Sequence, residues 1–163
     1  MILTKTIIER FKPIIYIPKE QQSRRLENVL YEIYRSYVVF WYHWPYDDYT
    51  GKPDYEPIVL VFQDDILAAI GIRPHQSYKR YHQWTTEKSR PIVIFETSWH
   101  APYIPQLSMR NVIRPFFMTR FSSIKIENYE IKGSKPPGWY IKDGARISVY
   151  DFAEHILDNL KKT

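Results

Sequence analysis

Six segments rich in β-branched and aromatic residues constrain the fold of this chain more than any other feature of its sequence. Such residues favour strands because they pack well on a pleated, half-buried surface, and turn signals separate the segments. Aromatic residues also make up 17% of the sequence. We expect strands at Tyr37–Trp44, Tyr55–Phe62, Ile66–Ile72, Pro91–Thr97, Arg110–Met118 and Ser123–Ile131.

Turns and amphipathic segments complete the expected fold. Gln63–Asp65 reads as a turn, so the strands on either side of it are expected to form an antiparallel hairpin. A further short strand is expected at 12–17. Between Lys19 and Tyr37 the apolar residues recur at helical spacing, which predicts an amphipathic helix. Ser148 is expected to cap a closing helix. The predicted fold class is α+β, mainly β, with antiparallel β-sandwich-like sheets and one helix near each end.

Length and composition exclude several classes of protein. A chain of 163 residues fits one domain, 1–163. It contains no cysteine, which rules out disulfides, thiolate metal sites and a cysteine nucleophile. Neither a signal peptide nor a long apolar stretch is present, so we expect no membrane span and a cytoplasmic location. Glycine-rich phosphate loops and nucleophile-elbow signatures are also missing.

Carboxylates are concentrated in one stretch, residues 47–56. Asp47 lies in a loop that follows a predicted strand, and Asp54 and Glu56 open the next strand two residues apart. Because side chains alternate along a strand, Asp54 and Glu56 should point to one face of the sheet, which Ile58 continues. Two neighbouring carboxylates repel each other unless a positive group neutralises them. A divalent ion or a basic side chain could neutralise the two carboxylates.

Two histidines could join these carboxylates. His75 and His100 each follow the end of a predicted strand, where loops gather and sites are usually built. Carboxylate oxygens with one or two imidazoles suit magnesium, manganese or zinc, depending on how many histidines bind the ion. The structural alternative is that the aspartates cap turns and the histidines are ordinary surface residues.

The order of these pieces resembles the necrosis- and ethylene-inducing-like toxin family and its relatives among fungal vacuolar-sorting proteins. The first two motifs of that family are similar to Tyr42–Asp47, with the sequence YHWPYD, and to 54–61, with the sequence DYEPIVLV. The segment 74–78 stands in place of the third motif and 91–101 in place of the fourth. The resemblance covers about residues 38 to 103.

This resemblance implies a β-sandwich with a divalent metal at one end, held by Asp47, Asp54 and Glu56. The family carries histidines just before its second motif, whereas this chain has glycine, lysine and proline at 51–53. An imidazole would therefore have to come from His43 or from the two strand-end histidines, unless Lys52 neutralises the carboxylates in place of an ion. Toxicity is not implied, because fold-level likeness does not transfer a function.

Basic and aromatic residues alternate between Arg73 and Arg90. This arrangement suits a single-stranded nucleic acid or a phosphosugar, because the basic groups neutralise phosphates while aromatic rings stack on bases. Its leading candidates are Arg73, Tyr78, Lys79 and Arg80. The alternative is a solvated segment whose aromatic residues anchor it to the core. A net charge of +5 permits an anionic partner without requiring one.

Our leading hypothesis is a divalent-metal-binding domain with a carboxylate–histidine pocket. Its metal ligands would be Asp47, Asp54, Glu56, His75 and His100. His43 and the basic group at 73–80 would then contact an anionic or sugar-bearing ligand. Were the protein an enzyme, the arrangement would suit metal-assisted hydrolysis. Two hypotheses stay open beside it: a non-enzymatic nucleic-acid or phosphosugar binder using 73–90, and a scaffold or assembly protein. The oligomeric state is not predicted.

Overall fold

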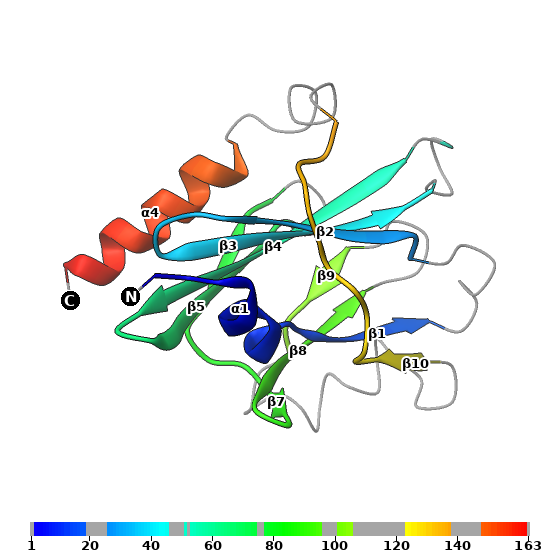
Figure 1. Ribbon diagram of the computed structural model, residues 1–163, viewed down its shortest axis with the longest axis horizontal. Helices are drawn as coiled ribbons and strands as arrows, with labels where there is room; N and C mark the ends of the chain where they lie inside the picture. The colour runs from blue at the N-terminus through cyan, green and yellow to red at the C-terminus, as the bar shows by residue number, and fades with distance from the viewer. Residues whose placement is uncertain are drawn as a thin grey trace.

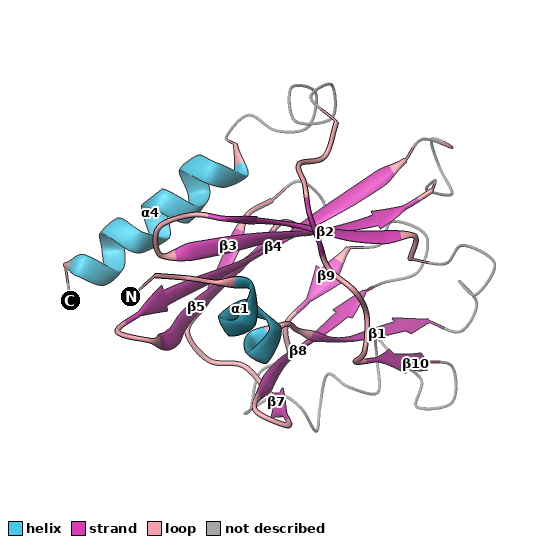
Figure 2. Cartoon of the chain, in the orientation of Figure 1, coloured by secondary structure: helices cyan, strands magenta, loops and turns pink. Residues whose placement is uncertain are grey.

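The computed structural model describes residues 2–18, 26–45, 51, 53–74, 77–95, 101–105, 123–137 and 148–162. The strands in these ranges form two sheets that face each other, and a long helix lies along the outer side of the larger sheet (Figures 1 and 2). The larger sheet has the order β11-β2-β3-β4-β5-β6, and the smaller has the order β10-β1-β8-β7, with β9 also paired to β8. The predicted fold class is confirmed.

The elements have the following bounds. The helices are α1 (Lys5–Phe11) and α4 (Val149–Lys161). The strands of the larger sheet are β2 (Asn28–Ile33), β3 (Tyr37–Trp44), β4 (Asp54–Gln63), β5 (Ile66–Ile72), β6 (Lys79–Tyr81) and β11 (Lys132–Gly133). Those of the smaller sheet are β1 (Ile14–Pro18), β7 (Thr86–Glu87), β8 (Arg90–Phe95), β9 (Pro102–Tyr103) and β10 (Ser123–Ile126).

Strand β3 lies between β2 and β4 and pairs antiparallel with both. All of its residues except His43 are buried, because the sheet is covered on both faces. Phe40 and Tyr42 point into the core between the two sheets, and Val39 and Trp41 point towards α4. Strands of this kind read as nearly continuous apolar runs, which is why the sequence identifies β3 so readily.

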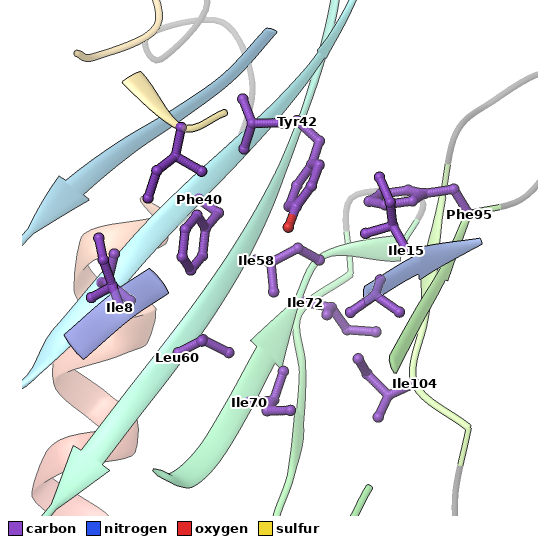
Figure 3. Close-up of a cluster of buried hydrophobic side chains, with 14 of the residues drawn as sticks. Ile8, Ile15, Phe40, Tyr42, Ile58, Leu60, Ile70, Ile72, Phe95 and Ile104 are labelled. Atoms are coloured by element: carbon purple, nitrogen blue, oxygen red, sulfur yellow. The ribbon is translucent and has the colours of Figure 1, made fainter. Parts of the chain in front are cut away.

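The core between the sheets combines the inner face of the larger sheet with residues of β1, β8 and α1 (Figure 3). It contains Ile58 and Leu60 of β4, Ile15 of β1, Phe95 of β8 and Ile8 of α1, all of them fully or almost fully buried. At about 25 cal/mol per Å² of buried apolar surface, such a core dominates the stability of a domain of this size.

Helix α4 packs its apolar stripe on the outer face of the larger sheet. The Ser148 side chain caps it by accepting a hydrogen bond from the Asp151 backbone N–H, as the sequence predicts. The helix approaches β5 closely at Gly71, where a Cβ atom would lie 2.5 Å from Cε1 of Phe152. Glycine at this position therefore allows helix and sheet to meet.

A buried carboxylate joins the first turn of α4 to the sheet. Glu32 is 8% exposed and accepts hydrogen bonds from Trp41 Nε1 at 2.9 Å, Tyr150 Oη at 2.8 Å and Tyr34 Oη at 2.9 Å. Three donors are enough to satisfy a carboxylate that has lost much of its contact with water. Burial and this carboxylate both raise the pKa of Tyr34, to about 12.

Several predicted elements agree with the structure. Strands β3 and β5 have the predicted bounds, and β4 is one residue longer at each end. Strands β4 and β5 form the predicted antiparallel hairpin. The predicted strand at Ser123–Ile131 ends early, because β10 stops at Ile126. The predicted strand at Arg110–Met118 lies outside the described residues.

The predicted helix between Lys19 and Tyr37 is wrong where the structure describes it, because Asn28–Ile33 forms β2. Val29 is buried in the core between the sheets and Leu30 in the core under α4. A strand that is buried on both faces places adjacent apolar residues on opposite sides, and this produces spacings that resemble a helix. The helix near the N-terminus is instead α1, which begins after an N-cap at Thr4.

Candidate ligand site at the end of the central strands

The pairing of β3 with β4 positions the two described carboxylates of the predicted metal site. Asp54 lies opposite Trp44, and Glu56 lies opposite Tyr42. Alternation along β4 places both carboxylates on the inner face, in line with Ile58 and the core between the sheets. The carboxylates thus lie where the two central strands reach the end of the sandwich.

Burial differs between these two carboxylates. Glu56 is only 9% exposed, whereas Asp54 is half-buried. The neighbouring Tyr42 and Trp44 are both fully buried, so the surroundings of Glu56 are largely aromatic. A carboxylate in such a place must be hydrogen-bonded, paired with a positive group or protonated, because an isolated buried charge is very costly. A positive group that comes close to Glu56 would stabilise the charged form of its carboxylate.

His43 lies on the opposite face of the sheet from these carboxylates, since it alternates with Tyr42 and Trp44. Its ring stacks on Tyr55, with centroids 4.2 Å apart and planes inclined by 8°. Its Nδ1 atom lies 3.5 Å from Glu27 Oε2 and 3.5 Å from Asn28 Nδ2. Burial lowers the pKa of His43, and the charges of Glu27 and Asp54 oppose that effect.

A groove of about 340 Å³ borders the same end of the larger sheet. It is lined by Leu26–Val29, which lead into β2, and by Tyr129–Lys132, which lead into β11. Glu27 and Asn28 belong both to this lining and to the surroundings of His43. Carboxylates, an amide, a lysine and an aromatic ring therefore meet within one hollow, a combination that can hydrogen-bond a polar ligand.

The remaining predicted metal ligands, Asp47, His75 and His100, lie outside the described residues. Among the residues that the structure describes, no group of three or more histidine, aspartate or glutamate side chains is placed to hold a metal ion. The described part of the predicted site consists of Asp54 and Glu56.

The basic and aromatic stretch divides into a packed part and an exposed part. Tyr78 stacks on Phe152 of α4, with centroids 4.5 Å apart, and burial raises its pKa. Arg73 is 8% exposed, and its guanidinium lies 5.9 Å from the Tyr78 ring. Lys79 and Arg80 are exposed on β6, at the edge of the larger sheet. Tyr78 therefore contributes to helix packing, with Arg73 beside its ring, as the structural alternative for this stretch expects.

Two other aromatic residues of this stretch, Tyr81 and Trp84, pack partly against the core between the sheets. Ring faces used for internal packing are not available to stack on bases. The exposed basic side chains that the described part of this stretch offers an anionic partner include Lys79 and Arg80 on β6, and also Lys88, which pairs with Glu127.

The sequence reading missed Glu32 and the surroundings of His43. Glu32 stands alone among apolar neighbours in a segment whose spacing predicts a helix, which conceals that Trp41 of the paired strand donates a hydrogen bond to it. Correct placement of β2 would have brought both Glu27 and Asn28 beside His43, because β2 and β3 pair antiparallel. The error in one element therefore hid part of the site.

The sequence matches no protein-family model and no curated protein. Among solved structures it is similar to one described as NLPPya in complex with glucosamine, with 16% sequence identity and a TM-score of 0.45. The match covers 63% of this chain and 69% of that chain. It is a weak likeness at the level of the fold, to one member of the necrosis- and ethylene-inducing-like proteins.

Within the part of the chain that the structure describes, no helix combines the length and apolar character that crossing a membrane requires.

Proposed function

We propose that this protein is a binding domain that holds a divalent cation at the end of the β3–β4 pair, through Asp54 and Glu56 together with Asp47. The observation that carries the proposal is the placement of Asp54 and Glu56 on one face at the end of the sandwich, with Glu56 only 9% exposed. Alternate residues of a strand are about 7 Å apart, so their flexible carboxylates can converge on one ion.

The donor set favours magnesium or manganese over zinc. Both described donors are carboxylates, which suit hard cations. Zinc sites more often include imidazole, and the ring of His43 lies on the other face of the sheet. The bound ion would neutralise the two carboxylates and offer open positions to an anionic or hydroxyl-bearing ligand. Zinc would therefore require His75 or His100.

The neighbouring groove supports a ligand-binding role for this end of the molecule. Glu27 and Asn28 line the groove and also approach Nδ1 of His43. The carboxylate and amide groups of this groove, with the imidazole of His43 beside them, provide the hydrogen bonds that a sugar-bearing ligand requires. We therefore propose that the cation and the groove bind one anionic or sugar-bearing ligand together.

Thermal unfolding with and without added magnesium, manganese or zinc tests the cation site. An ion at a hundred times its Kd stabilises the folded state by about 2.7 kcal/mol. For a chain of this size, that corresponds to a rise in Tm of about 5–10 °C. The double substitution Asp54→Asn, Glu56→Gln should abolish the rise, whereas Asp158→Asn on the exposed face of α4 should preserve it.

The cation proposal fails if none of the three ions raises Tm, or if the double variant responds as the wild type does. The ligand is tested separately, by titrating glucosamine and inorganic phosphate with and without a chelator. A cation-dependent ligand should lose affinity when the chelator is added, and also when Asn28→Ala alters the groove.

A further inference from the structure

A second groove lies at the opposite end of the larger sheet, beside the turn that joins β4 to β5. This end is at the left of Figure 1, where both chain termini also lie. The groove has a volume of about 420 Å³. Its lining comes from the turn, from Ser36 and from the last turns of α4; it comprises Ser36, Phe62, Gln63, Asp64, Asp65, Leu157, Leu160 and Lys161. The cation site does not share any of these residues.

Apolar surface is exposed next to this groove. Ile66 is 66% exposed, and its pairing with Gln63 places it at the base of the turn. Leu67 points into the core between the sheets, so alternation directs Ile66 to the face that α4 covers. Leu157 and Leu160 of α4 line the groove on that same side. Ile66 therefore extends the apolar part of the groove onto the surface.

The side of the groove formed by the turn is negatively charged. Neither Asp64 nor Asp65 makes an ion pair with any described residue. The C-terminal end of α4, which carries the negative end of the helix dipole, also points to this region. Lys161 in the last turn of α4 also lines the groove and offsets part of this charge, so among the described lining residues two carboxylates and the helix end outweigh one lysine.

We propose that this groove docks a segment of a partner protein in which an apolar residue is flanked by lysine or arginine. The apolar residue would contact Ile66, Leu157 and Leu160, and the basic residues would pair with Asp64 and Asp65. Charge complementarity selects this occupant, because a basic segment gains from both the carboxylates and the helix end. The inference does not depend on the cation site.

The turn allows both carboxylates to be removed without harm to the fold. Asp64 and Asp65 have φ angles of 51° and 64°, in the left-handed region. Two-residue hairpin turns of this kind prefer Asn-Gly, so Asp64→Asn, Asp65→Gly should fold at least as well as the wild type. A matched control exists at Lys88 and Ser89, whose φ angles are 53° and 63°; the same exchange there leaves the groove intact.

The probe is a short fluorescein-labelled peptide in which leucine is flanked by lysine and arginine, and its counterpart carries glutamate at the basic positions. By fluorescence anisotropy, the wild type should bind the basic peptide and not the acidic one. Asp64→Asn, Asp65→Gly should weaken binding about tenfold, and Ile66→Ser about fivefold. The control exchange at Lys88 and Ser89 should leave binding unchanged.

Three results would overturn the proposal. The first is equal binding by the wild type and by Asp64→Asn, Asp65→Gly, or no binding by either. The second is a loss in that variant with no effect of Ile66→Ser, which would indicate general electrostatic attraction without docking. The third is a concentration-dependent dimer, seen by sedimentation, that Ile66→Ser dissociates, because the occupant would then be a second copy of this chain.

Discussion

The close approach of α4 to β5 predicts that Gly71→Ala is destabilising for a steric reason. The added Cβ would lie 2.5 Å from Phe152 Cε1 and 3.1 Å from Ile156 Cδ1, and the first of these distances is not tolerated. Phe152 would have to move, which would disturb its stacking on Tyr78 at 4.5 Å. Overpacking of this kind costs about 1–3 kcal/mol, and a cost of about 2 kcal/mol should lower Tm by about 4–8 °C.

A double-mutant cycle with Phe152→Ala separates this clash from other effects. Removal of the ring removes the obstructing atoms, so Gly71→Ala in the Phe152→Ala background should cost less than about 0.5 kcal/mol. Urea denaturation of all four proteins gives the coupling energy. Gly133→Ala is a control, because its nearest neighbour, Tyr31 Cζ, lies 3.3 Å from the added Cβ and can shift. Equal costs of Gly71→Ala in both backgrounds would refute the steric explanation.

Three further predictions concern buried polar groups. Glu32→Gln should lower the free energy of unfolding by about 1–3 kcal/mol, because the NH₂ group of the new amide would face a donor such as Trp41 Nε1. Urea denaturation measures this loss. Burial raises the pKa of Tyr42 and Tyr129 above 10.0, so the unfolded chain loses these protons first. Stability should therefore fall as pH rises above about 10, by about 1.4 kcal/mol per pH unit for each tyrosine, and a flat profile from pH 9 to 11.5 would contradict this. Burial lowers the pKa of His43 below 6.5, so stability should also fall as pH drops below about 6.5. His43→Phe keeps a ring on Tyr55 and should flatten that acidic limb of the unfolding profile.

Local sequence signals were sufficient for elements whose pattern is local. Strand β5 has the expected bounds and α4 begins after the expected cap at Ser148, because turns, a cap residue and apolar periodicity all lie within the segment. The alternation that places Asp54 and Glu56 on one face also requires only β4. In contrast, the sequence predicts a helix where β2 lies, because its apolar spacing reflects two separate cores that cannot be recognised without the tertiary fold.

Contacts between residues far apart in the sequence could not be predicted for a similar reason. The contact between Tyr150 and Glu32 joins the last helix to the second strand, and no spacing rule connects them. Packing of Tyr78 on Phe152 likewise depends on where α4 crosses the sheet, so the sequence could not separate a stacking platform from an anchor. The sequence offers His43 as a substitute metal ligand because no histidine precedes the second motif, and that His43 lies on the other face of the sheet follows only once Tyr42 is known to point inward.

The pairing of β1 constrains the order in which the chain can fold during synthesis. This early strand lies between two late ones, since Ile14 pairs in parallel with Ile92 and Ile15 pairs with Ile126. A ribosome must therefore release most of the chain before the smaller sheet can close over its partner. Until then α1, through Ile8, covers only part of the inner face of the larger sheet, on which Phe40 and Leu60 lie. Nascent chains of this protein should accordingly fold late and depend on chaperones to prevent association.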